Sequence, residues 1–183
     1  MARVLDGITE QLRTFLEAQP VFFVATAPNS DDGHINCSPK GLDTFRVLDE
    51  HTVAYLDLTG SGIETVAHVR ENARITLMFC AFTGRPDIVR LYGRGRVVTA
   101  DEPDAADLLA RFPELPGTRS VIVVDVERVS SSCGYAVPRM SLDEPRDGLI
   151  DWATKKGAPA LAEYHAEKNA RSIDGLPGLP GLA

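Results

Sequence analysis

Polar residues that could do chemistry gather in three short segments, and residues 58–72 (LTGSGIETVAHVREN) form the richest of them. A predicted strand ends here, a Gly/Ser loop follows, and a helix begins. The first turn of a helix offers free backbone N–H groups and the positive end of the helix dipole, so it can hold a phosphate. Ser61 and Glu64 also have the S-x-x-E spacing of a capping box, which only stabilises the helix start. The residues alone leave both interpretations open.

Residues 36–41 (NCSPKG) form the second segment, at the end of a predicted strand. Asn36, Ser38 and Lys40 supply an amide, a hydroxyl and an ammonium, which are the donors that a phosphate or a flavin ring needs. The alternative is an edge strand that Pro39 and Lys40 protect against pairing with other chains.

Three arginines form the third segment, a long predicted strand at residues 87–99. The even spacing of Arg90, Arg94 and Arg96 places them on one face, unless the glycines between them introduce a bulge. Such a row is typical of a solvated barrel exterior. The competing hypothesis is that Arg90 contacts a ligand or a partner subunit.

The histidines and cysteines predict neither a metal site nor a nucleophile. None of the four histidines has metal-ligand spacing, and Cys37, Cys80 and Cys133 lie far apart in the chain. Their odd number argues against a disulfide framework and favours a reducing cytoplasm. A nucleophilic cysteine would need a nearby base, and the sequence identifies none. We therefore name no catalytic residue.

Composition narrows the class of protein further. The chain has 183 residues and a net charge of −7, which argues against nucleic acid or an anionic membrane surface as partner. No apolar run approaches the roughly 20 residues that a membrane span needs, and the first residues lack the apolar core of a secretory signal. We expect a cytoplasmic protein that acts on a small molecule.

The elements that must position these segments are mostly strands. Apolar and alternating runs predict six of them, at residues 21–27, 34–40, 52–58, 74–82, 87–99 and 119–130. Helices are predicted at residues 5–18, 62–71, 103–112 and, as one or two helices, 145–169. This order favours a mainly β fold, a six-stranded antiparallel barrel with peripheral helices. We expect one domain over residues 1–170, followed by a Gly/Pro-rich tail at 171–183 that is extended or disordered.

The order of these segments resembles a known family. The segments, taken in order, are similar to those of the split-barrel flavoproteins related to pyridoxamine 5′-phosphate oxidase. They are an N-terminal helix, VFFVATA, a D-G turn, a strand ending in SPKG, TVAYLDLTGSG, a helix with HVREN, RITLMF and VRLYGRGRVV. The resemblance covers roughly residues 8–130. It implies an FMN-dependent oxidoreductase that works as a homodimer, with FMN at the dimer interface.

The resemblance also implies which residues contact the cofactor. Asn36, Ser38 and Lys40 match the strand that contacts the flavin ring and phosphate. The loop that holds the phosphate corresponds to Leu58, Thr59, Gly60 and Ser61, with Thr65 in the helix that follows it. Arg90 lies on the face from which a polar side chain often reaches the flavin.

Two departures from the family pattern keep other functions open. Glu64 and Thr65 stand where FMN-binding members often have Arg and Lys, so a carboxylate replaces a phosphate-neutralising cation. The C-terminal Trp followed by Arg-Leu of true pyridoxamine-phosphate oxidases is absent, because Trp152 precedes Ala153 and Thr154. We therefore do not assign vitamin B6 oxidation. The alternatives are a dimer that has lost flavin binding and serves as a binding or structural protein, and a deazaflavin-dependent reductase.

Overall fold

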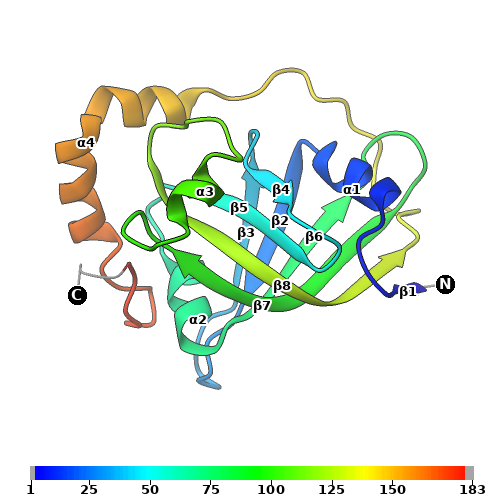
Figure 1. Ribbon diagram of the computed structural model, residues 1–183, viewed down its shortest axis with the longest axis horizontal. Helices are drawn as coiled ribbons and strands as arrows, with labels where there is room; N and C mark the ends of the chain where they lie inside the picture. Colours follow the sequence, from blue (N-terminus) through cyan, green and yellow to red (C-terminus); the bar gives the residue numbers. More distant parts are fainter. Residues whose placement is uncertain (1–2, 180–183) are drawn as a thin grey trace.

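The sheet of the molecule curls into a half-open barrel, and most helices lie at its rim (Figure 1). The computed structural model describes residues 3–179. The strands are β1 (Arg3–Leu5), β2 (Val21–Thr26), β3 (Asn36–Gly41), β4 (Phe45–Val47), β5 (Thr52–Leu58), β6 (Arg74–Cys80), β7 (Ile88–Val98) and β8 (Thr118–Ser132). The helices are α1 (Glu10–Glu17), α2 (Glu64–Asn72), α3 (Ala105–Leu109) and α4 (Gly148–Lys168).

The sheet is antiparallel throughout and follows the order β3-β2-β6-β7-β8-β5-β4, with β1 paired to β8 off this path. This confirms the predicted mainly β split barrel with peripheral helices. The predicted number of strands was wrong, because the described residues form eight rather than six. The two additional strands, β1 and β4, have three residues each and are fixed by their partners rather than by their own sequence.

The predicted first helix was too long at its N-terminal end. Residues 3–5 pair with Val129, Ser130 and Ser131 of β8, so the chain is extended there. The helix starts only at Glu10, where the hydroxyl of Thr9 accepts a hydrogen bond from the backbone N–H of Leu12 at 3.3 Å. A threonine in this position satisfies one of the unpaired N–H groups of the first turn.

The interior of the barrel is apolar and fully closed to solvent. Leu77, Leu91, Ile122 and Val124 have no exposed surface and come from three adjacent strands. Gly93 lets strands β7 and β8 approach closely, because a Cβ at this position would lie 2.1 Å from the carbonyl oxygen of Asp125. The core therefore holds β6, β7 and β8 as a rigid wall on which the shorter strands rest.

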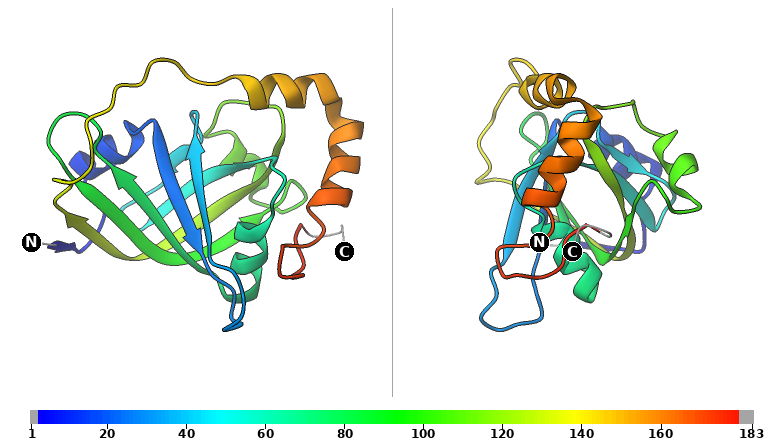
Figure 2. Two further views of the ribbon diagram at one scale, coloured as in Figure 1. Left: turned by 180° about the vertical axis from the view of Figure 1, so that it is seen from behind. Right: turned by 90° about the vertical axis from the view of Figure 1, so that its left-hand side faces the viewer.

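Helix α4 bends by a sharp corner and runs down the end of the barrel where α2 lies (Figure 2). The corner is at Gly157, whose backbone φ of 70° and ψ of 164° are not helical, and Pro159 follows two residues later. Residues 145–169 were predicted as one or two helices, and the bend divides α4 into two arms. No helix among residues 3–179 is both long and apolar enough to cross a bilayer.

The first part of the predicted tail folds back on the barrel. Residues 171–179 form a turn in which Arg171 and Pro177 make an isolated β-bridge. Leu179 is 6% exposed and belongs to the main core, and Arg70 donates a hydrogen bond to the carbonyl oxygen of Gly178. Residues 180–183 of the predicted tail lie outside the described residues.

Candidate functional site

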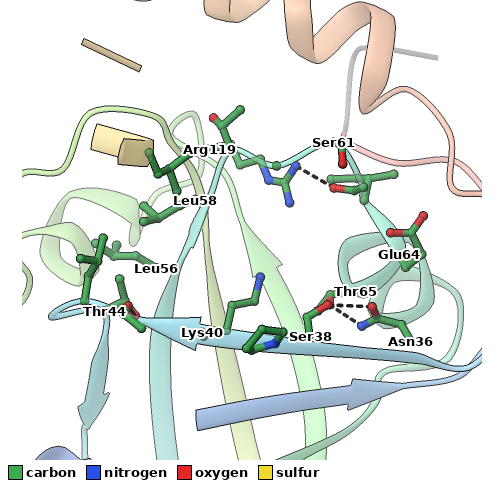
Figure 3. Close-up of a pocket in the computed structure, with 18 of the residues that line it drawn as sticks. Asn36, Ser38, Lys40, Thr44, Leu56, Leu58, Ser61, Glu64, Thr65 and Arg119 are labelled. Carbon is green, nitrogen blue, oxygen red and sulfur yellow. Dashed lines mark hydrogen bonds between the residues drawn. The ribbon is translucent and has the colours of Figure 1, made fainter. Parts of the chain in front are cut away.

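A cavity of about 570 Å³ opens between β3, the loop after β5 and the start of α2 (Figure 3). Eight of the nine residues named from the sequence line it. They are Asn36, Ser38, Lys40, Leu58, Thr59, Gly60, Ser61 and Thr65. The order of the curled sheet is consistent with this convergence, because β3 is one edge strand and β5 lies next to the other edge strand, β4. Two segments that are separate in the sequence therefore face one another across the cavity.

Hydrogen bonds hold the side chains of β3 in one arrangement. The Nδ2 group of Asn36 donates to the hydroxyl oxygens of Thr65 at 3.0 Å and Thr26 at 3.3 Å. The hydroxyl of Ser38 donates to Oδ1 of Asn36 at 2.8 Å. These bonds use the proton of Ser38, so its oxygen presents lone pairs to the cavity.

A buried histidine stands behind this network. His68 of α2 has no exposed surface, and its Nδ1 lies 3.0 Å from the hydroxyl oxygen of Thr26. Its Nε2 has no hydrogen-bond partner among residues 3–179. Burial lowers the pKa of His68 below its ordinary value of 6.5, so the ring is neutral at pH 7.

A buried ion pair lies at the floor of the cavity, where Lys40 and Arg119 line the cavity and their partner Asp57 does not. Asp57 is fully buried, and its carboxylate accepts hydrogen bonds from Nε of Arg119 at 2.6 Å and from Nζ of Lys40 at 3.5 Å. Burial alone would raise the pKa of Asp57, but the charges and hydrogen bonds of Arg119 and Lys40 outweigh it and hold that pKa below 3.8. The three groups together carry one positive charge.

A β-bulge turns Arg119 toward this ion pair. Asp57 pairs with Ser120 and Leu58 pairs with Thr118, so Arg119 is the extra residue of β8 at this point. A bulge of this kind re-aims a side chain that regular alternation would direct elsewhere. The Arg119 side chain is only 5% exposed, and its Nη1 also donates to the carbonyl oxygen of Gly62 at 3.0 Å.

The capping box, one of the two interpretations of the start of α2, is not formed. The helix begins at Glu64 with Ile63 as its N-cap, and no side chain caps it. The Oε1 atom of Glu64 instead accepts a hydrogen bond from the backbone N–H of Ile173 at 3.2 Å. The carboxylate therefore ties the C-terminal turn to the helix start, although Glu64 still lines the cavity.

Arg90 does not line this cavity. It pairs with Ser130 of β8, far along that strand from Arg119, and its Nη1 donates to the hydroxyl of Ser132 at 3.3 Å. Arg94 and Arg96 alternate with buried residues on β7 and are exposed, as expected for a barrel exterior. The structure thus separates Arg90 from the other eight predicted residues within one chain.

Sequence reasoning missed several residues of the site. Among them, Arg119, Arg146 and Leu149 line the cavity, and Asp57 pairs with Lys40 and Arg119 without lining it. One signal was present, because Asp57 is the single charged residue of the apolar strand TVAYLDL and a buried charge requires a partner. Nothing in the sequence near Arg119 identifies that partner.

The last turn of α4 closes one side of the site. The hydroxyl of Thr59 donates to the carbonyl oxygen of Gly117 at 2.7 Å, so it accepts from the Nε2–H of His165 at 2.8 Å. Asn169 accepts from Nη1 of Arg119 at 2.9 Å and donates to the carbonyl oxygen of Gly60 at 3.1 Å. Within residues 3–179, no group of histidines, cysteines and carboxylates is placed to hold a metal ion.

Comparison with known proteins places this chain in a family. The family model described as pyridoxamine 5′-phosphate oxidase matches residues 8–133. A pyridoxamine 5′-phosphate oxidase family protein of Aspergillus flavus, ustO, is 40% identical over 193 aligned residues, which cover 95% of this chain and 76% of that protein. The chain belongs to the pyridoxamine 5′-phosphate oxidase-like family.

Solved structures share the fold. HupZ from Group A Streptococcus aligns with a TM-score of 0.53 at 25% identity, over 67% of this chain and 91% of that chain. A FAD-binding protein from Mesorhizobium loti aligns with a TM-score of 0.51 at 15% identity, over 72% of this chain and 95% of that chain. The family match ends at residue 133, so α4 and the C-terminal turn lie beyond it.

Proposed function

We propose that the cavity binds FMN and that the protein is an FMN-dependent oxidoreductase acting on a small molecule. The observation that carries the proposal is the convergence of the polar side chains of β3, a helix start and one net positive charge on a single cavity of about 570 Å³. This volume lies within the roughly 300–1,000 Å³ typical of small-molecule sites. A flavin supplies the redox chemistry, and the protein supplies binding and orientation.

The donor set fits a phosphate despite Glu64. Lys40 has three N–H donors, and its one ion-pair contact, to Asp57 at 3.5 Å, is long. Arg119 engages Asp57, Gly62 and Asn169 with most of its donors and is the less available cation. Glu64 is occupied by the backbone N–H of Ile173. Lys40 and the free N–H groups of the first turn of α2 would therefore hold the phosphate.

The β3 side chains would meet the ring system. Hydrogen bonds hold Asn36 and Ser38 of β3 and Thr65 of α2 in one arrangement, so these side chains present fixed polar groups, among them the lone pairs of the Ser38 oxygen. Fixed polar groups bind a rigid ring without losing side-chain freedom on binding. These residues position a cofactor, and no side chain is assigned as a proton donor.

A homodimer completes the proposal. Arg90 lies too far along β7 to reach the cavity of its own chain, so a flavin contact from Arg90 requires a second copy. We expect an interface above about 1,000 Å², the size of a specific interface. Light scattering that gives a monomer mass at micromolar concentration would contradict the dimer.

We also propose a cytoplasmic location. Cys37, Cys80 and Cys133 are free thiols, which supports this location.

Fluorescence titration with FMN, riboflavin and a deazaflavin tests the function. The proposal predicts that the protein quenches FMN fluorescence and binds FMN at least tenfold more tightly than riboflavin, because riboflavin lacks the phosphate. Equal affinities would show that no phosphate site is present. Selective binding of the deazaflavin would favour a deazaflavin-dependent reductase, and no binding of any of the three would favour a structural or binding protein.

A further inference from the structure

The C-terminal segment, defined here as residues 134–179, forms a wall of the candidate site although the family match ends before it. Arg146 and Leu149 of this segment line the same cavity as Lys40 and Thr65. Figure 3 shows the coil of α4 above the rim of the cavity, on the side opposite β3. The C-terminal segment therefore borders any molecule that enters the cavity along this rim.

Three contacts hold this wall in place. Ala153 in the first arm of α4 is 1% exposed, and it packs on Gly117, where an added Cβ would lie 3.0 Å from the Ala153 side chain. In the second arm, His165 and Asn169 bind the loop after β5. Because both arms are anchored, the start of α4 is held at the rim.

Arg146 is the charged residue of the C-terminal segment that lines the cavity among the described residues. It makes no ion pair or hydrogen bond with residues 3–179, whereas Lys40 and Arg119 share the carboxylate of Asp57. Its acidic neighbours Asp143, Glu144 and Asp147 do not line the cavity. Arg146 is exposed and lies in the coil two residues before α4, where it lines the cavity together with the apolar Leu149. An arginine without a partner at such a rim suits a planar anion that it can bind through two hydrogen bonds.

We propose that Arg146 binds a carboxylate of the substrate, so that the oxidoreductase acts on a small carboxylic acid whose apolar part rests on Leu149. This inference rests on the proposed function, since it gives Lys40 to the cofactor phosphate and Arg146 to the substrate. The C-terminal segment thereby selects the substrate, while the barrel and α2 bind the cofactor.

Calorimetric titration with benzoate and its neutral analogue benzamide tests this division of roles. Benzoate should bind the FMN-loaded protein, benzamide should bind at least tenfold more weakly, and Arg146→Gln should weaken benzoate binding at least tenfold. Arg146→Gln should leave FMN affinity within twofold of the wild type. The matched control is Arg139→Gln, which changes an exposed arginine of the same segment that lies on a different cavity.

Each other outcome overturns the inference. Equal binding of benzoate and benzamide, undetectable benzoate binding, or unchanged benzoate affinity in Arg146→Gln would remove the carboxylate site. A tenfold loss of FMN affinity in Arg146→Gln would assign Arg146 to the cofactor phosphate instead. If the protein binds no FMN, the proposed function fails, and the same benzoate titration on the flavin-free protein still decides whether Arg146 binds a carboxylate.

Discussion

Arg119 neutralises Asp57 at the floor of the cavity by two hydrogen bonds, from Nε to Oδ2 at 2.6 Å and from Nη2 to Oδ1 at 3.3 Å. Ser120 donates to the same carboxylate at 3.4 Å. The bulge between Asp57 and Leu58 creates this contact, because it brings a residue of β8 inward at the end of the barrel. The pair joins β5, β8 and, through Asn169, the end of α4.

Removing the charge of Asp57 should destabilise the fold strongly. Asp57→Asn leaves the buried guanidinium of Arg119 without a counter-ion, and breaking a buried ion pair in this way costs about 3–5 kcal/mol. Denaturant unfolding measures the loss. Asp107→Asn is the control, since Asp107 is exposed on α3 and should keep the wild-type midpoint. A loss below about 1 kcal/mol for Asp57→Asn would contradict the buried pair.

Acidification should lower stability before the carboxylates titrate. Burial, together with the charge of Arg119 in the case of His165, holds the pKa values of His68 and His165 below 6.5. The unfolded chain takes up these protons near pH 6.5 and the folded protein does not, so stability is full above that pH and falls below it. His165→Gln should flatten the decline just below pH 6.5 in denaturant titrations and leave the curve unchanged above pH 7. An identical decline in the variant would refute the assignment.

Lys40→Ala should weaken FMN binding. Loss of one hydrogen bond to a charged group costs about 1.5–3 kcal/mol, which is roughly tenfold or more in affinity. The fold should survive, because Arg119 still neutralises Asp57. Calorimetry measures the affinity, with Lys155→Ala on the exposed face of α4 as the control. Unchanged affinity, accompanied by aggregation in light scattering, would mean that Lys40 only protects the edge strand β3.

Gly157→Ala should loosen the wall formed by α4. The backbone of Gly157 has φ 70° and ψ 164°, a region almost confined to glycine, so an alanine there costs about 1–3 kcal/mol. No atom lies within 4 Å of the added Cβ, so the cost is strain and not a clash. Hydrogen exchange should become faster in α4 but not in β7. Gly148→Ala, also in open space at the helix start, is the control. Equal exchange in both variants would show that the bend is not strained.

Local pattern was sufficient to predict the barrel. Alternating and apolar runs such as VFFVAT and TVAYLDL determine buried strands on their own, and turn residues separate them. The resemblance to a family, more than the spacing of the residues, predicted that Asn36, Lys40 and Thr65 belong to one site. All three line one cavity in the structure. Strand β1 escaped prediction because three residues form a strand only when β8 provides the partner.

The rest of the site depends on contacts between distant parts of the chain. Arg119 meets Asp57 only because of a register shift between two strands, and no local pattern encodes a register shift of this kind. His165 reaches Thr59 across 106 positions of sequence. Glu64 shows the opposite error, since its spacing from Ser61 is that of a capping box and the structure gives the carboxylate to Ile173 instead.

The central claim is that the cavity between β3 and α2 binds FMN. The most direct measurement is the mass and visible spectrum of the small molecule released when protein purified from cells is denatured. The account predicts a yellow protein that releases FMN, in an amount comparable to that of the chain. A colourless protein that releases no flavin, and that leaves the fluorescence of added FMN unchanged, would contradict it.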